Sequence, residues 1–217
     1  MEITAKDFIE DWEEFIEDRI KNVDRVKGGG WHSKWKSNTD WSNFILGGKK
    51  SSYEISPIGL FFQDKYGQRN LGFRSEDGSV DLSLFDQRSV FEFTTLDKNW
   101  KLKPDERNDY PSNYLAIIEH ENKLYTAWEE IAKLTYFHSR LKVLISYHSS
   151  DNLSEDKRRL EMQMIEKSFS SVLSKSNEVY PENPLTEYLF IMGGVVKDHL
   201  TWDYRIFNSM GNIIPNQ

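Results

Sequence analysis

The sequence predicts an α/β protein with a mixed central β-sheet flanked by helices. Short apolar runs typical of buried strands occur at 71–74, 80–85, 115–121 and 141–147. Helical apolar spacing occurs around them, at 4–26, 56–67, 125–138 and 154–176. The Asp77-Gly78 pair between the first two strands indicates a hairpin, because this dipeptide suits a tight turn.

The N-terminal part is predicted to be helical. Thr4 is a plausible N-cap of the first helix, whose apolar and acidic positions alternate at helical spacing. The run 28–30 of three glycines ends it. Ser56 and Pro57 begin a second helix that Gly67 closes, since serine is a favoured N-cap and proline is tolerated at the first helical position.

Composition indicates one domain of 217 residues, with a helical part at 1–70, a core at 71–148 and a C-terminal helix with strands at 149–217. Cysteine is absent, which excludes a disulfide scaffold and fits a cytoplasmic location. No apolar run approaches the roughly 18–20 residues that span a bilayer, so no membrane association is expected.

Acidic residues interrupt two of the predicted strands. Asp81 stands among apolar residues at 80–85. The later strand begins at Leu115 and places Glu119, Glu121 and Lys123 at alternate positions, which share one face if the strand continues through them. Buried charge is costly unless it is paired or binds a metal, so these acids suggest a functional site.

This order of elements resembles the PD-(D/E)XK nuclease superfamily, which has the restriction-endonuclease-like fold. Asp81 matches the family's aspartate, and Glu119-His120-Glu121 matches a variant of its second motif in which glutamate replaces lysine. The alternative register, Glu121-Asn122-Lys123, keeps the lysine. The resemblance spans 71–148 and implies a metal-dependent endonuclease that hydrolyses phosphodiester bonds, with DNA favoured.

The resemblance also implies roles for these residues. Asp81, Glu119 and the backbone carbonyl of His120 would bind Mg²⁺ or Mn²⁺, and Glu121 or Lys123 would orient the attacking water. Glu54, just before the second helix, is a further candidate acid, as is a glutamate of the first helix. A possible homodimer is expected as well.

Structural alternatives stay open for each of these residues. Asp81 could bond the amides of its own turn. The two glutamates could instead form ion pairs with Lys123, Arg140 or Lys142. The His120 ring, which points to the opposite face, could be a packing residue. The net charge of −7 favours a second function, a catalytically inactive nucleic-acid- or protein-binding module of the same fold.

The long segment 86–114 separates the two acidic strands and contains a predicted strand at 89–95. Lys98, Trp100, Lys101 and Lys103 follow it and are candidate nucleic-acid contacts beside the acids, because aromatic and basic side chains bind bases and phosphates. A covering flap with solvated lysines is the alternative. Beyond the core, Leu160, Met164, Ile165 and Phe169 are expected to line the buried face of the helix at 154–176, before strands at 187–192 and 201–207.

Overall fold

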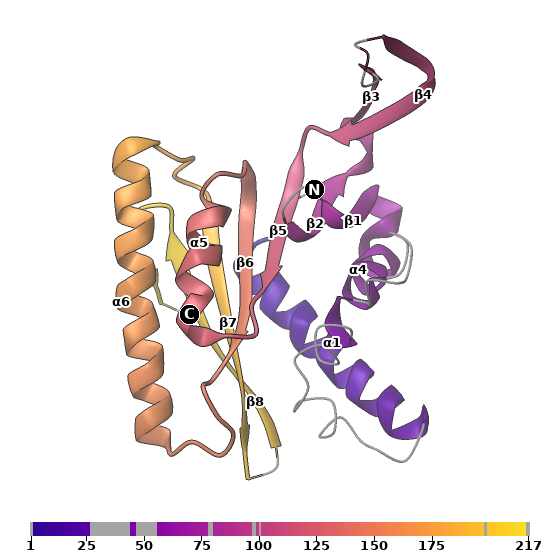
Figure 1. The fold of residues 1–217 in the computed structure, drawn as a ribbon. Coiled ribbons are helices and arrows are strands. Elements are labelled where there is room, and N and C mark those ends of the chain that lie inside the picture. Colours follow the sequence, from indigo (N-terminus) through magenta and orange to yellow (C-terminus); the bar gives the residue numbers. More distant parts are fainter. Residues whose placement is uncertain are drawn as a thin grey trace.

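A seven-stranded mixed sheet with helices on both faces forms the centre of the molecule (Figure 1). The computed structural model describes residues 2–26, 44–46, 56–77, 80–96, 99, 101–197 and 199–215. The predicted α/β class with a mixed sheet is therefore confirmed. None of the described helices combines the length and the apolar character that crossing a bilayer requires.

The strand order is β1-β2-β5-β6-β7-β8-β9. The strands span Leu71–Asp77 (β1), Val80–Asp86 (β2), Tyr114–His120 (β5), Ser139–Tyr147 (β6), Glu187–Val196 (β7), His199–Asn208 (β8) and Ile213–Ile214 (β9). The pairs β1–β2 and β2–β5 are antiparallel, the pairs β5–β6 and β6–β7 are parallel, and the pairs β7–β8 and β8–β9 are again antiparallel. Parallel neighbours need long crossovers, and helices provide both of them here.

Four α-helices of the described residues cover the sheet. They span Ala5–Val26 (α1), Pro57–Tyr66 (α4), Ala127–Leu134 (α5) and Glu155–Val179 (α6). The predicted N-caps Thr4 and Ser56 are confirmed, because their hydroxyl groups accept from backbone amides three residues later, and Ser154 caps α6 in the same way. α4 ends at Tyr66 with Gly67 as its C-cap, as predicted, and a 3₁₀ turn continues from Gly67 to Arg69, where Asn70 follows with a φ of 63°.

Two apolar cores lie on opposite faces of the sheet. In Figure 1, α1 and α4 cover one face and α5 and α6 cover the other. Trp12 and Phe62 belong to the first core, where the Trp12 ring meets Trp202 edge-on at 4.9 Å. Phe169 of α6 belongs to the second core, where it packs against Phe190 of β7.

The predicted buried face of α6 is partly wrong. Met162, Ile165 and Phe169 are buried, whereas Leu160 and Met164 are 56% and 63% exposed. The sequence pattern is ambiguous because Met162 and Met164 are two residues apart and point to different sides of a helix. The helix predicted at 125–138 is shorter than expected, with a 3₁₀ turn at Leu124–Thr126 before α5.

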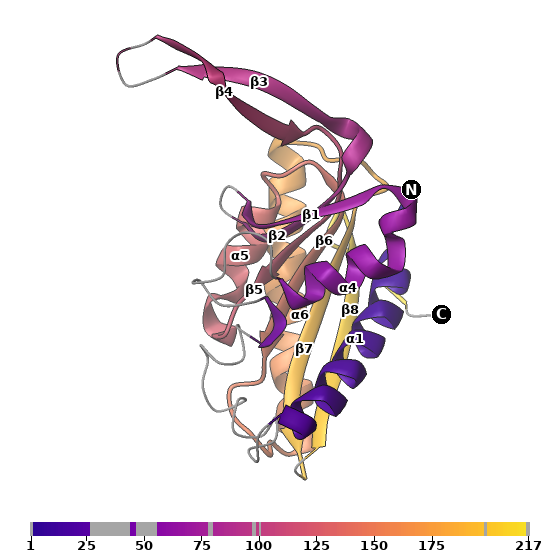
Figure 2. The same cartoon turned by 90° about the vertical axis from the view of Figure 1, so that its right-hand side faces the viewer.

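The segment between β2 and β5 forms a separate two-stranded hairpin, the β3–β4 arm, of β3 (Val90–Leu96) and β4 (Leu102–Pro111). The predicted strand at 89–95 is confirmed, after a 3₁₀ turn at Gln87–Ser89. Figures 1 and 2 show the arm projecting well beyond the sheet. At its base, Ser112 donates from both its backbone amide and its hydroxyl group to the carbonyl oxygen of Ser89.

Candidate functional site

Asp81 and Glu119 lie opposite each other on neighbouring strands. The antiparallel register pairs Leu82 of β2 with Ile118 of β5. One residue further along in the same register, Asp81 lies opposite Glu119. The Oδ2 atom of Asp81 accepts from the backbone amide of His120 at 2.8 Å. The structure therefore joins two of the acids that the sequence suggested.

Burial makes ionisation of both acids unfavourable. Glu119 is only 2% exposed, and burial is the first cause that raises its pKa, to about 8, with the Asp81 carboxylate adding to the shift. Burial also raises the pKa of Asp81, although the His120 amide opposes that change. Burial therefore favours the protonated form of each carboxyl group.

Lys133 of α5 is the basic partner of this pair. Its Nζ atom lies 2.8 Å from Oε1 of Glu119 and 2.5 Å from Oε2 of Glu130. Burial lowers the pKa of Lys133, but its contacts with the two glutamates outweigh burial and the net shift is upward. We call Asp81, Glu119, Glu130 and Lys133 the acid cluster.

Sequence reasoning missed Lys133 and Glu130 as members of the site. The one available signal was their spacing of three on a short helix, which allows an ion pair but does not show where the pair points. The expected alternative partners are engaged elsewhere. Lys142 bonds Glu182, and Arg140 bonds Glu2.

The predicted strand through Lys123 is wrong. β5 ends at His120, and the Oε1 atom of Glu121 accepts from the backbone amide of Lys123 at 2.7 Å. This local turn replaces the extended backbone, so the period-two argument that put Glu121 and Lys123 beside Glu119 does not apply. The catalytic roles suggested for these two residues stay predictions.

The His120 ring packs on the face opposite the acid cluster. Its Nε2 atom lies 2.5 Å from the Tyr147 hydroxyl group, and Tyr147 belongs to the core beneath α1 and α4. Burial lowers the pKa of His120 to about 4, so the ring is neutral at physiological pH. The packing role was one of the two alternatives left open. The metal-binding role of its carbonyl group stays a prediction.

The two candidates of the arm that the structure describes are not beside the acids. Lys101 is exposed in the β3–β4 arm, and Lys103 lies in β4. The arm leaves β2 after Asp86 and returns before β5, so it adjoins the ends of these strands that are farthest from Asp81, about 16 Å away at 3.3 Å per residue. The predicted neighbourhood of arm and acids is therefore wrong. Glu54, Lys98 and Trp100 lie outside the described residues.

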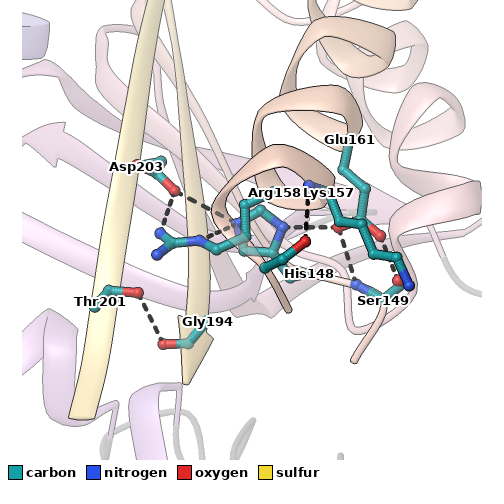
Figure 3. A network of polar contacts seen from close by, with 9 residues as sticks. His148, Ser149, Lys157, Arg158, Glu161, Gly194, Thr201 and Asp203 are labelled. Carbon is teal, nitrogen blue, oxygen red and sulfur yellow. Dashed lines mark hydrogen bonds and ion pairs between the residues drawn. The ribbon is translucent and has the colours of Figure 1, made fainter. Parts of the chain in front are cut away.

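A second polar network, missed at the sequence level, lies at the end of β6 (Figure 3). We call it the His148 cluster, formed by His148, Ser149, Arg158, Glu161 and Asp203. The Nδ1 atom of His148 lies 2.7 Å from Glu161 Oε2, and Arg158 Nε donates to His148 Nε2 at 3.3 Å. The Arg158 guanidinium also contacts Asp203 of β8 at 2.5 Å.

The His148 cluster fastens the first turns of α6 to β6 and β8. The room for its imidazole ring comes from Gly194 of β7, where a Cβ atom would lie 2.8 Å from His148 Cδ2. Both carboxylates of the cluster already contact a cationic or hydrogen-bonding side chain. The network is therefore well suited to hold elements together.

The acid cluster has donors that suit a magnesium ion. Within the described residues, no group of three or more histidine, cysteine, aspartate or glutamate side chains has a metal-binding arrangement. Mg²⁺ is nevertheless commonly held by one or two carboxylates together with substrate phosphates and water. Oε1 of Glu119 is buried and lies 2.8 Å from the Lys133 ammonium group. Asp81 and Glu119 thus fit a two-carboxylate site.

Comparisons with known proteins identify no family. No family model and no curated protein matches the chain. Among solved structures, the central domain of yeast acetyl-CoA carboxylase has a TM-score of 0.36 at 9% identity, covering 96% of this chain and 34% of that one. A carbon-nitrogen hydrolase from Helicobacter pylori G27 has a TM-score of 0.37 at 8% identity, covering 98% and 80%. The chain thus spans about a third of the first protein's length.

Proposed function

We propose that this protein is a Mg²⁺- or Mn²⁺-dependent nuclease of restriction-endonuclease-like fold that hydrolyses phosphodiester bonds, with DNA as the favoured substrate. The observation that carries the proposal is the position of Asp81 directly opposite Glu119, with Lys133 2.8 Å from Glu119. Two carboxyl groups and one ammonium group are the side chains that the resembled family uses for this reaction.

The order of elements supports the same proposal. The chain contains the hairpin β1–β2 with the aspartate on its second strand, then β5 with the glutamate, helix α5 and the parallel strand β6. This is the order on which the resemblance to the PD-(D/E)XK superfamily was based. The β3–β4 arm is an insertion between the two acidic strands and leaves their pairing intact.

In the proposed reaction, Asp81 and Glu119 hold the metal ion through their carboxylate oxygens. When bound, Mg²⁺ would activate a water molecule and neutralise charge on the phosphate. Glu119 has a pKa of about 8, so it must release its proton before it can act as a ligand. Metal binding is therefore expected to strengthen as the pH rises toward 8.

Lys133 takes the water-orienting role that the sequence assigned to Glu121 or Lys123. It extends from α5 rather than from β5, and it contacts Glu119 directly. An ammonium group beside the carboxylates stabilises a hydroxide nucleophile and the negative charge that develops on the phosphate. Displacement of Lys133 from Glu119 is required if Glu119 is to bind the metal through Oε1.

The alternative function is a catalytically inactive binding module of the same fold. The contact between Lys133 and Glu119 favours it, because the ammonium group already neutralises the carboxylate that would bind a cation. The net charge of −7 also opposes a polyanionic ligand. In either case Lys98, Trp100, Lys101 and Lys103 of the arm are the proposed nucleic-acid contacts, and a homodimer is a possible assembly.

The proposal is tested by incubating the protein with supercoiled plasmid, single-stranded DNA and RNA, in Mg²⁺, Mn²⁺ or a chelator. We expect metal-dependent cleavage of DNA that Asp81→Asn and Glu119→Gln each reduce by at least about 100-fold, as for removal of a group that acts on the reacting atoms. Asp86→Asn is the matched control, since Asp86 lies on the same strand and pairs with Arg88 instead.

A thermal-shift titration separates the two functions. The nuclease predicts that Mg²⁺ stabilises the wild type and not Glu119→Gln, because a ligand that binds the native state raises its stability. Salt-sensitive DNA binding without cleavage or metal response would favour the binding module. Absence of cleavage, metal response and nucleic-acid binding together would refute the nuclease and the nucleic-acid-binding form of the module, and would leave only a protein-binding module.

A further inference from the structure

The two long edges of the β3–β4 arm differ in composition. β3 contains no proline and one charged residue, Glu92, among residues that favour strands. β4 contains Pro104 and Pro111 and five charged residues. Proline and charge are the usual protections of exposed strand edges, because they oppose pairing with another chain. The outer edge of β4 is therefore protected, and that of β3 is open to pairing.

The arm also lacks a third strand. Within the described part of the chain, β3 pairs with β4 alone, in a two-stranded sheet that projects from the body (Figure 2). Such a hairpin has marginal stability by itself in water, and additional strands are what stabilise it. Phe91 near the base of β3 is 49% exposed, so the arm presents apolar surface beside its open edge.

We propose that the outer edge of β3 pairs antiparallel with the same edge of a second copy of this chain. The two arms then form one four-stranded sheet across a two-fold axis, a symmetric contact of the kind most homodimers use. An axis at Phe93 lies in the regular part of β3, since the register of β3 against β4 shifts only between Thr94 and Leu96. In this register Glu92 lies opposite Thr94 of the second copy, so no like charges meet.

Charge favours a second copy over nucleic acid as the partner of this edge. Binding of phosphates requires lysine or arginine, and the only charged residue of β3 is an acid. The backbone amides and carbonyls of a second β3 satisfy those of the first, whereas a nucleic-acid duplex offers no such ladder. The basic residues of the arm, including Lys101, lie outside β3 and are not used by this contact.

Two variants of one residue test the register. Residue 94 of each copy lies opposite Glu92 of the other copy, so one substitution changes two cross-strand pairs. Thr94→Glu puts an acid opposite Glu92 in both pairs, and Thr94→Lys puts a base there. We expect sedimentation equilibrium to show a concentration-dependent dimer whose Kd rises about 2- to 30-fold for Thr94→Glu and falls by a similar factor for Thr94→Lys. Both variants should keep the wild-type melting temperature of the body, since the arm stands apart from the cores.

Crosslinking gives an independent readout, because the chain has no cysteine. Residues directly opposite in an antiparallel pair have Cα atoms about 4.5–5.5 Å apart, within the range of a disulfide. Phe93→Cys lies on the proposed axis and should form a covalent dimer on mild oxidation. Asn108→Cys, the residue that pairs with Phe93 inside the arm, is the matched control and should not.

Several outcomes would overturn the proposal. These are a monomer at concentrations of about 100 μM, association that neither Thr94 variant changes, or equal crosslinking by Phe93→Cys and Asn108→Cys. A protein that stays monomeric but binds DNA more tightly as Thr94→Lys and more weakly as Thr94→Glu would assign this edge to nucleic acid. The test uses no nuclease assay, so its result is independent of the proposed catalytic activity.

Discussion

Replacement of Glu119 by glutamine is expected to remove a distinct pH dependence from the stability of the fold. Glu119 has an ordinary pKa of 4.5, and burial together with the Asp81 carboxylate raises it to about 8 in the folded protein. The folded state therefore binds a proton that the unfolded state releases. This stabilisation is fully present below pH 4.5 and is lost as the pH rises toward 8.

The size of the effect follows from the two pKa values. A difference of one bound proton between the folded and unfolded states changes the free energy of unfolding by about 1.4 kcal/mol per pH unit. Between pH 5 and pH 7.5, the Glu119 contribution is expected to fall by about 3 kcal/mol. Glutamine keeps the shape of the protonated side chain and does not titrate. The variant should therefore gain stability relative to the wild type by this amount across the interval.

The assay is urea unfolding followed by tryptophan fluorescence, at half-unit steps from pH 5 to pH 7.5 and without divalent metal. The quantity compared is the free energy of unfolding of the wild type minus that of Glu119→Gln, so that other titrating groups cancel. Glu129→Gln, an exposed change on α5, is the matched control and should give a flat difference. A flat difference for Glu119→Gln as well would refute the raised pKa and with it the pH dependence expected for metal binding.

Three further changes test the packing. Gly194→Ala should lower the free energy of unfolding by about 1–3 kcal/mol, because the new Cβ atom would overlap the imidazole ring of His148. Gly67→Ala is the control: the nearest atom to its Cβ would be 3.7 Å away, so the change should be neutral or stabilise by up to about 1 kcal/mol. Thermal melts of the two variants test this difference. Glu182→Ala should cost about 3 kcal/mol in urea unfolding by stranding the buried ammonium group of Lys142, and Lys142→Met should cost less because it removes that charge. Ser56→Ala should cost about 1–2 kcal/mol, measured in the same way, since its buried hydroxyl group caps α4; an unchanged stability would contradict the capping role.

Local features of the chain predicted the elements of this protein well. The N-caps of α1, α4 and α6, the hairpin of β1 and β2, and the strands β3 and β6 all follow from residue types and periodicities within a few positions of one another. The expectation that Asp81 and Glu119 come together rested on the resemblance to the PD-(D/E)XK superfamily, and the antiparallel register of β2 and β5 places them opposite each other. The acids were recognisable because charge within apolar strands is costly.

The partners of those acids could not be predicted in the same way. Lys133 contacts Glu119, and Glu130 contacts Lys133, because α5 packs over the sheet at a particular rotation about its axis. That rotation depends on side chains from several elements of the second core. The end of β5 at His120 was missed for a similar reason, because the alternating charges that follow suit either a strand or a surface turn. In the structure, Glu121 binds the amide of Lys123 and the chain turns.

The sequence by itself therefore determined the α/β class, the identity and order of most elements, and the two acids that interrupt apolar strands, since these depend on short-range periodicity and on the cost of burying charge. The tertiary structure alone decided which lysine neutralises Glu119, which face of α6 is buried, that His148 connects three elements, and that the arm stands apart with one open edge. Each of these depends on contacts between segments far apart in the chain, and their geometry is set by the packing of the whole sheet and its helices.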